Sequence, residues 1–197
     1  MAAAKTKKPL RRKWLLYALL IIVLLVAGFK VYNHFSIAAN KRAFQNARTT
    51  IDSIYYDAVK QIGPADNAQT SSSCSRNHVE FGRGQLSCNV GIDFIYGVNN
   101  ETDANSKMAA IQRTIKQSKL EQEQTLSSAL KDTVVASSYY HTASDIYKFQ
   151  GLDCTSSYIY DTPQLTSLNV QDQTKKTFEI SIGCSGPAKQ QYYRLAS

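Results

Sequence analysis

The first 51 residues of the chain contain no aspartate or glutamate. Basic residues are frequent at this end, with six in the first 13 positions. These are Lys5, Lys7, Lys8, Arg11, Arg12 and Lys13. From residue 30 onward the charges nearly balance, with 17 basic and 15 acidic residues. The formal net charge of +8 is therefore concentrated in a tail, and the body of the chain gives no reason to expect a nucleic-acid partner.

Charge of either sign is absent from the next stretch, which runs from Trp14 to Phe29 and is followed by Lys30. A helix of this length spans roughly 24 Å, against about 30 Å for the hydrocarbon core of a bilayer. Lys30 can extend its ammonium group toward the headgroups, so the apolar residues beyond it complete a crossing. The sequence predicts a basic tail over 1–13 and a single transmembrane helix over 14–35, with Trp14 at one interface.

The charge asymmetry also predicts the orientation of this helix. Positive residues are retained on the cytoplasmic side, so we expect a cytoplasmic N-terminus, an extracytoplasmic C-terminal domain and contact of the tail with anionic lipid. The lipid bilayer is thus one expected partner. A cleaved signal peptide is the alternative, because Ser36-Ile37-Ala38 has the small residues of a cleavage site.

Cysteine is scarce, and all four cysteines follow the apolar stretch. An even number on the side expected to be oxidising favours disulfides. Three pairings are possible, and we favour Cys74 with Cys88 and Cys154 with Cys184, because each pair joins a polar loop to a nearby strand.

Helical periodicity continues beyond the apolar stretch. Ile37, Phe44, Ile51 and Ala58 recur every seven residues, and Gly63-Pro64 is typical of a helix end. We expect a stalk or core helix over 36–63, either continuous with the transmembrane helix or separated from it by a break at 33–36. Exposure of its apolar stripe would favour a homo-oligomer, and burial of the stripe would favour a monomer.

The remainder, 64–197, reads as one disulfide-stabilised α+β domain. Residues 65–77 read as a polar loop, 79–96 as a hairpin around Gly82-Arg83-Gly84, and 168–184 as a second hairpin. Helical periodicity begins after a cap at Thr102 or Asp103 and resumes over 126–134. Short strands are expected at 146–149, 158–160 and 192–195. The pattern predicts helices packed on an antiparallel sheet and is consistent with a duplicated α-β-β unit.

Catalytic motifs are missing. The chain has three histidines (His34, His78 and His141), no Gly-x-Ser-x-Gly motif, and no complete phosphate-binding loop at its glycine pairs. Cys74 and His78 do not have a familiar zinc-ligand spacing. We therefore expect no catalytic, cofactor-binding or metal-binding residues and no cofactor.

Tyrosine is the one residue in clear excess, with 12 copies. Tyrosine side chains are favoured in binding surfaces, although they are also ordinary strand residues. The candidates for a binding surface are Tyr139, Tyr140, Tyr158, Tyr160, Tyr192 and Tyr193.

The predicted organisation resembles that of bitopic accessory proteins of pilus and secretion machines, which combine a basic tail, one membrane helix, a helical stalk and a duplicated α-β-β domain. Type IV pilins differ, since they place a glycine before the apolar stretch, whereas here Gly28-Phe29 lies at its end and Lys30 follows. The resemblance implies an accessory role in an envelope assembly.

Together these patterns predict a non-enzymatic, single-pass membrane protein with an extracytoplasmic binding or scaffolding domain. Its expected partners are the bilayer and other envelope or membrane proteins. An exported enzyme such as a hydrolase and a small-ligand sensor on the same anchor are the alternatives.

Overall fold

The structure of the protein is a computed structural model in which the chain forms two compact units, Met1–Ala39 and Asn40–Ser197. Helix α1 (Pro9–Ile62) begins in the first unit and ends in the second. It is helical throughout 33–36, so the expected continuous helix is observed and the alternative of a break there is wrong. The described residues are 9–76, 84–125, 130–135, 138–160, 176–190 and 192.

The first unit consists of the N-terminal part of α1. Every large apolar side chain from Trp14 to Phe35 is more than half exposed. The apolar part has a mean hydropathy of 2.5, and none of it is buried. Its length and composition are sufficient for one membrane crossing.

The second part of α1 is amphipathic and lies within the second unit. Its buried residues recur at spacings of three, four and seven, as expected for one face of a helix. They are Ala43, Phe44, Ala47, Ile51, Ile54 and Ala58. The helix ends at Ile62, and the next residue, Gly63, has a φ of 87° and donates its amide to the Val59 carbonyl at 2.9 Å. The predicted glycine end of the helix is thus confirmed.

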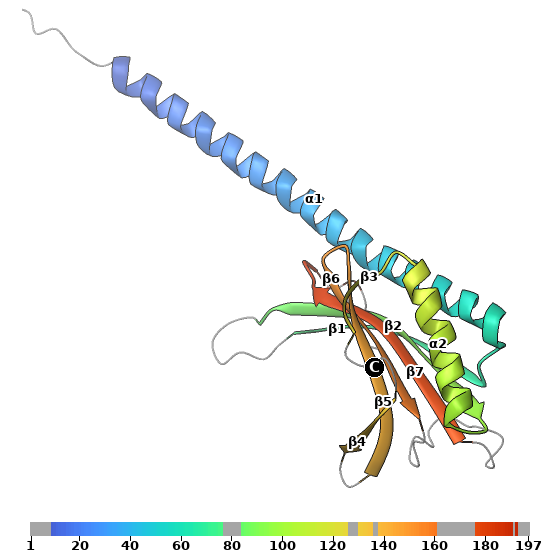
Figure 1. Ribbon diagram of the computed structural model, residues 1–197. Coiled ribbons are helices and arrows are strands. Elements are labelled where there is room, and N and C mark those ends of the chain that lie inside the picture. Colours follow the sequence, from blue (N-terminus) through green and yellow to red (C-terminus); the bar gives the residue numbers. More distant parts are fainter. Residues whose placement is uncertain are drawn as a thin grey trace, which may run out of the picture. The chain divides into compact units, whose positions relative to one another are not determined.

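The second unit is built on an antiparallel sheet (Figure 1). The order along the sheet is β1-β2-β7-β6-β5-β3, and β4 pairs with another part of β5. The bounds are β1 Asn67–Arg76, β2 Leu86–Val98, β3 Glu121–Thr125, β4 Lys131–Val135, β5 Ser138–Phe149, β6 Leu152–Tyr160 and β7 Lys176–Pro187.

The core lies on one face of the sheet, where α1 and α2 (Glu101–Gln117) contribute their apolar sides. Alternate residues of β2 point into it, from Leu86 to Val98, as the predicted alternation requires. Strand β7 supplies Phe178, Ile180 and Ile182 in the same way. The predicted α+β class, with helices on an antiparallel sheet, is confirmed.

The N-cap of α2 lies two residues before Thr102 and three before Asp103, the predicted caps. Asn100 is the N-cap, and its side-chain oxygen accepts the Asp103 amide at 2.9 Å. Asparagine and threonine both cap helices, so composition alone did not distinguish Asn100 from Thr102. The predicted apolar positions Met108, Ile111 and Ile115 are all buried.

Two segments adopt a different secondary structure from the one predicted. Residues 67–76, expected to be a loop, form β1, because an edge strand can leave polar side chains in water while its backbone pairs with β2. The helix expected over 126–134 is also wrong, since β4 occupies 131–135. Thr133, Val134 and Val135 are β-branched, and pairing with β5 outweighs the helical spacing.

The predicted hairpins also differ in their partners. β2 pairs with β1 and β7, and residues 79–81, which were expected to form the first strand of its hairpin, lie outside the described residues. The later strand of the hairpin expected over 168–184 is observed as β7, and both of its edges are occupied from Phe178 to Ser185, by β2 and β6. Residues 168–175, the earlier strand and turn of that hairpin, lie outside the described residues. Tyr192 lies outside any strand. The second half runs from α2 through β3 to β7, which is not a simple copy of α1-β1-β2.

Candidate functional site

Both disulfides join directly opposite residues of neighbouring strands. Cys74 of β1 pairs with Cys88 of β2, and Cys154 of β6 pairs with Cys184 of β7, with Cα atoms 4.0 and 3.9 Å apart. This is the favoured pairing. The sequence predicted which cysteines pair, but it placed Cys74 in a loop, whereas the bond braces the edge strand against the sheet.

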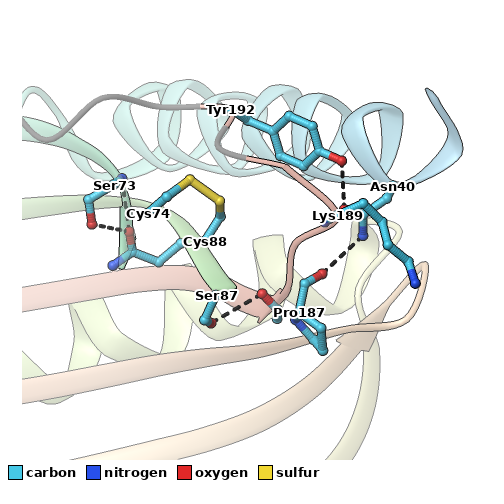
Figure 2. The surroundings of a disulfide bond; sticks show 10 residues. Asn40, Ser73, Cys74, Ser87, Cys88, Pro187, Lys189 and Tyr192 are labelled. Atoms are coloured by element: carbon cyan, nitrogen blue, oxygen red, sulfur yellow. Dashed lines mark hydrogen bonds between the residues drawn. A yellow bond between two sulfur atoms is a disulfide. The ribbon is translucent and has the colours of Figure 1, made fainter. Parts of the chain in front are cut away.

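A hydrogen-bonded clasp lies near the first disulfide and joins the end of the sheet to α1 (Figure 2). The Asn40 side chain donates to the Pro187 carbonyl at 3.0 Å. Its oxygen accepts the Lys189 amide at 3.0 Å and the Tyr192 hydroxyl at 2.8 Å. The Tyr192 ring also lies 5.7 Å from that of Phe44. Asn40 was not singled out in the sequence, because no local pattern links it to residues about 150 positions away.

The sheet face opposite the core carries a shallow polar groove of about 210 Å³ across β1, β2, β7 and β6. Its polar lining includes Ser71, Asn89, Asp93, Thr155, Ser181 and Ser185. Gly91 and Gly183 face each other at its floor, where a Cβ on Gly91 would meet the Ile182 carbonyl at 3.1 Å. The hollow thus depends on two glycines and on the small side chains around them. The sequence did not predict it, because its lining comes from four different strands.

Acidic groups lie close to this groove. Asp93 lines it, and burial raises the pKa of the Glu179 carboxyl above its ordinary value, with a further contribution from the nearby Asp93 charge. The groove therefore favours polar ligands that donate hydrogen bonds or carry positive charge, such as a peptide segment with free amides.

A second hollow, of about 320 Å³, lies between the second part of α1 and α2. Thr49, Ser53 and Asp57 line it from α1, and Thr114 and Gln117 line it from α2. Gln61 donates to the Thr114 hydroxyl at 3.1 Å and joins the two helices. Asp57 is paired with Lys60 at 2.8 Å, and Lys119 adds a basic side chain to the lining, so the hollow carries charge of both signs.

Polar side chains also occur within the core, at the junction of β5, β6 and α2. Asp145 is buried and accepts from Gln112 of α2 at 3.1 Å. Ser156 and Tyr158 are buried, and neither hydroxyl has a hydrogen-bond partner within the described part of the chain. Burial raises the pKa of Tyr147 to about 12 and raises that of Tyr158 further. These groups are closed off from solvent and do not form an open site.

The predicted tyrosine surface is partly wrong. Tyr158 is 0% exposed and Tyr160 is 3% exposed, because even-numbered residues of β6 face the core. Tyr192 is partly buried in the clasp. Tyr139 and Tyr140 belong to β5, where their side chains are outside the described part, and Tyr193 lies outside the described residues altogether.

The remaining candidates fall in different parts of the chain. Trp14 is 73% exposed and Lys30 is exposed on α1, whereas the basic side chains of the tail lie outside the description. His34 is on α1, His141 packs edge-on to Tyr160, and His78 lies outside the described residues. Neither hollow is lined by a histidine. Among the described residues, no three His, Cys, Asp or Glu side chains gather to hold a metal ion.

Comparison of the chain with protein-family models, with curated proteins and with solved structures finds no match.

Proposed function

We propose that this chain is a single-pass membrane protein whose disulfide-braced domain is extracytoplasmic and serves as a non-catalytic binding or scaffolding module of a cell-envelope assembly. The observation that carries the proposal is one helix with two environments. Its first part exposes a continuous apolar stretch from Trp14 to Phe29, and one face of its second part is buried against a sheet braced by two disulfides.

The exposed apolar part supports membrane insertion on energetic grounds. Removing apolar surface from water is favourable by about 25 cal/mol per Å². Exposure of this apolar stretch to water is therefore strongly unfavourable, and its insertion into lipid is favourable. The disulfides support an oxidising compartment for the domain, and the basic tail supports a cytoplasmic N-terminus.

The shape of the domain supports binding rather than chemistry. The groove on the open sheet face is shallow, is lined by small polar side chains and the Asp93 carboxylate, and has no histidine in its lining to act as a base for a serine hydroxyl. Phe44, Ile51 and Ile54 are buried in their own domain, so this stripe of the stalk is not free to join a second copy. We place the binding surface of the proposed scaffold at the groove.

Membrane fractionation tests the anchor. We expect the chain to stay in the membrane after a carbonate wash, with its N-terminus intact and no thiol labelled before reduction. Recovery of a soluble protein that begins after residue 28, or labelling of several native thiols, would contradict the proposal.

Charge substitution tests the orientation. Replacing the six basic residues of the tail by glutamine should produce a mixed orientation, as measured by protease access to the domain from outside the cell. The matched control replaces Lys30, Lys41 and Arg42, which lie beyond the apolar stretch, and should keep the native orientation. Equal behaviour of the two variants would contradict the assigned role of the tail.

Binding at the groove is tested by cross-linking and pull-down from membranes. An Asp93→Lys, Ser181→Lys double variant should lose the envelope proteins that the unmodified chain captures. A Glu101→Lys variant, which changes an exposed position at the start of α2, should retain them. Retention by both variants would place the binding surface elsewhere.

A further inference from the structure

The two edges of the sheet differ in how well they are protected against pairing with another strand. An exposed edge presents unpaired backbone groups, and proteins usually guard it with short strands, bulges or charged side chains. The edge formed by β3 has such features. It has five residues, a shift in register between Gln122 and Gln124, and the charged side chains of Glu121 and Glu123.

The other edge of the sheet is formed by β1 (Figure 1), and it is less well protected. It runs for ten residues in unbroken register with β2, and Arg76 at its end is its one charged residue. It contains no proline or lysine, and most of its side chains are exposed. The Cys74–Cys88 disulfide fixes it to the sheet, so the edge is held extended without a neighbour on its outer side among the described residues.

The disulfide also indicates which backbone groups point outward. Opposite residues of an antiparallel pair are about 4.5 Å apart when they are not hydrogen-bonded to each other and about 5.5 Å apart when they are. Cys74 and Cys88 have Cα atoms 4.0 Å apart, so they form a non-hydrogen-bonded pair. The even-numbered residues of β1 therefore direct their N–H and C=O groups away from β2.

We propose that the β1 edge pairs with β1 of a second copy of this chain, antiparallel about a two-fold axis at Ser71, to form one continuous sheet across two molecules. Antiparallel pairing of identical strands is self-complementary, so the same edge serves both copies. In this register Ala68 lies opposite Cys74 and Thr70 lies opposite Ser72, so the backbone N–H and C=O groups that point away from β2 bond to each other. Ser71 lies opposite its own counterpart.

Charged residues at the ends of β1 favour pairing with a second copy of this chain in this register. Asp66 comes directly before the strand and Arg76 ends it. With Ser71 on the axis, Asp66 of each copy lies opposite Arg76 of the other, and the pairing gains two opposite-charge contacts. Parallel pairing would place Arg76 against Arg76. The remaining strand residues are uncharged, so no repulsion opposes the approach.

Proline substitution on the outer edge tests the proposal. Thr70→Pro removes an outward N–H without removing a bond to β2, whereas Thr70→Ala keeps that N–H. For the full chain in detergent micelles, we expect sedimentation to show dimers for the unmodified chain and Thr70→Ala, and about tenfold or greater weakening for Thr70→Pro. Unchanged thermal unfolding would show that Thr70→Pro still folds. Arg76→Glu should also weaken the dimer.

Cysteine cross-linking tests the register. Ser71→Cys should form a disulfide between two copies, because residues 71 would face each other at a non-hydrogen-bonded position. Ser75→Cys should not, since the two residues 75 would lie roughly 27 Å apart along the strands. A monomeric chain, equal dimerisation of Thr70→Pro, equal cross-linking at 71 and 75, or pairing of β1 with a different protein would overturn the proposal. None of these outcomes depends on membrane orientation, so the proposed anchoring is tested separately.

Discussion

A single asparagine joins the end of the sheet to the start of the packed part of α1. Asn40 uses both ends of its amide, donating to the Pro187 carbonyl and accepting from the Lys189 amide and the Tyr192 hydroxyl. These partners follow β7, so the residues after the last strand are held against the helix. At this scale, the structure depends on one polar side chain and three groups that lie about 150 positions away in the chain.

Substitution of Asn40 should loosen this end of the domain. Asn40→Ala leaves the Lys189 amide and Pro187 carbonyl without this partner, and we expect it to lower the free energy of unfolding by about 1–3 kcal/mol. Hydrogen exchange should show faster exchange at Lys189. Asn40→Asp, which keeps the acceptor, should preserve more of the protection. Asn46→Ala, which removes one exposed bond to Gln150, is the control and should have little effect.

The two disulfides act at the scale of elements, because each fixes one strand to its neighbour. The bond between Cys74 and Cys88 closes a sequence separation of 14, and the bond between Cys154 and Cys184 closes one of 30. The first secures an edge strand whose side chains are mostly polar, and the second lies in the centre of the sheet. Composition misidentified β1 as a loop, since its attachment relies on backbone pairing and a covalent bond.

Removal of each disulfide by paired alanine substitutions should therefore lower the free energy of unfolding, by a different amount for each bond. The chain-entropy model gives about 3 kcal/mol for the shorter loop and about 3.7 kcal/mol for the longer one. We expect both variants to unfold at lower temperature by calorimetry in micelles, with the Cys154/Cys184 variant lower. In the Cys74/Cys88 variant, the extra hydrogen exchange should be concentrated in β1. Uniform exchange across the sheet in that variant would show that β1 is not a separately braced element.

At the scale of the whole molecule, buried tyrosine hydroxyls make the stability of the folded chain depend on pH. Burial raises the pKa of Tyr96 and of Tyr147 to about 12, from an ordinary value of 10.0, and raises that of Tyr158 further. In the unfolded chain all three would ionise near 10, whereas in the folded chain they stay neutral to higher pH. The unfolded state therefore holds fewer protons than the folded state above pH 10.

The stability of the folded chain should consequently fall as the pH rises from 10 toward 12. Each of these tyrosines contributes a slope of about 1.4 kcal/mol per pH unit over that range. Urea unfolding followed by circular dichroism at several pH values measures this slope, and absorbance at alkaline pH shows late-ionising phenols. Tyr158→Phe should reduce the slope, whereas Tyr56→Phe, at an exposed position, should not. A flat profile above pH 10 would contradict the burial of these groups.

The prediction from sequence was most accurate where one physical pattern was sufficient. The apolar stretch after Trp14, the glycine end at Gly63 and the alternation from Leu86 to Tyr96 each depend on neighbouring residues, so they are readable locally. β4 was misread as helix because a few apolar residues at helical spacing cannot reveal a strand partner. Tyr158 was misplaced on the surface because the face to which a strand residue points depends on which side the helices cover.

The sequence by itself determined the candidate membrane helix and the α+β class, because hydropathy and periodicity act over short distances, and it favoured the observed cysteine pairs among three possible pairings. Only the tertiary structure decided that Asn67–Arg76 form an unguarded edge strand, that Gly91 and Gly183 meet beneath a polar groove, and that Asn40 holds the end of the sheet. The physical reason is that strand order and register bring together residues far apart in the chain, and backbone hydrogen bonds, which every residue can make, set that order.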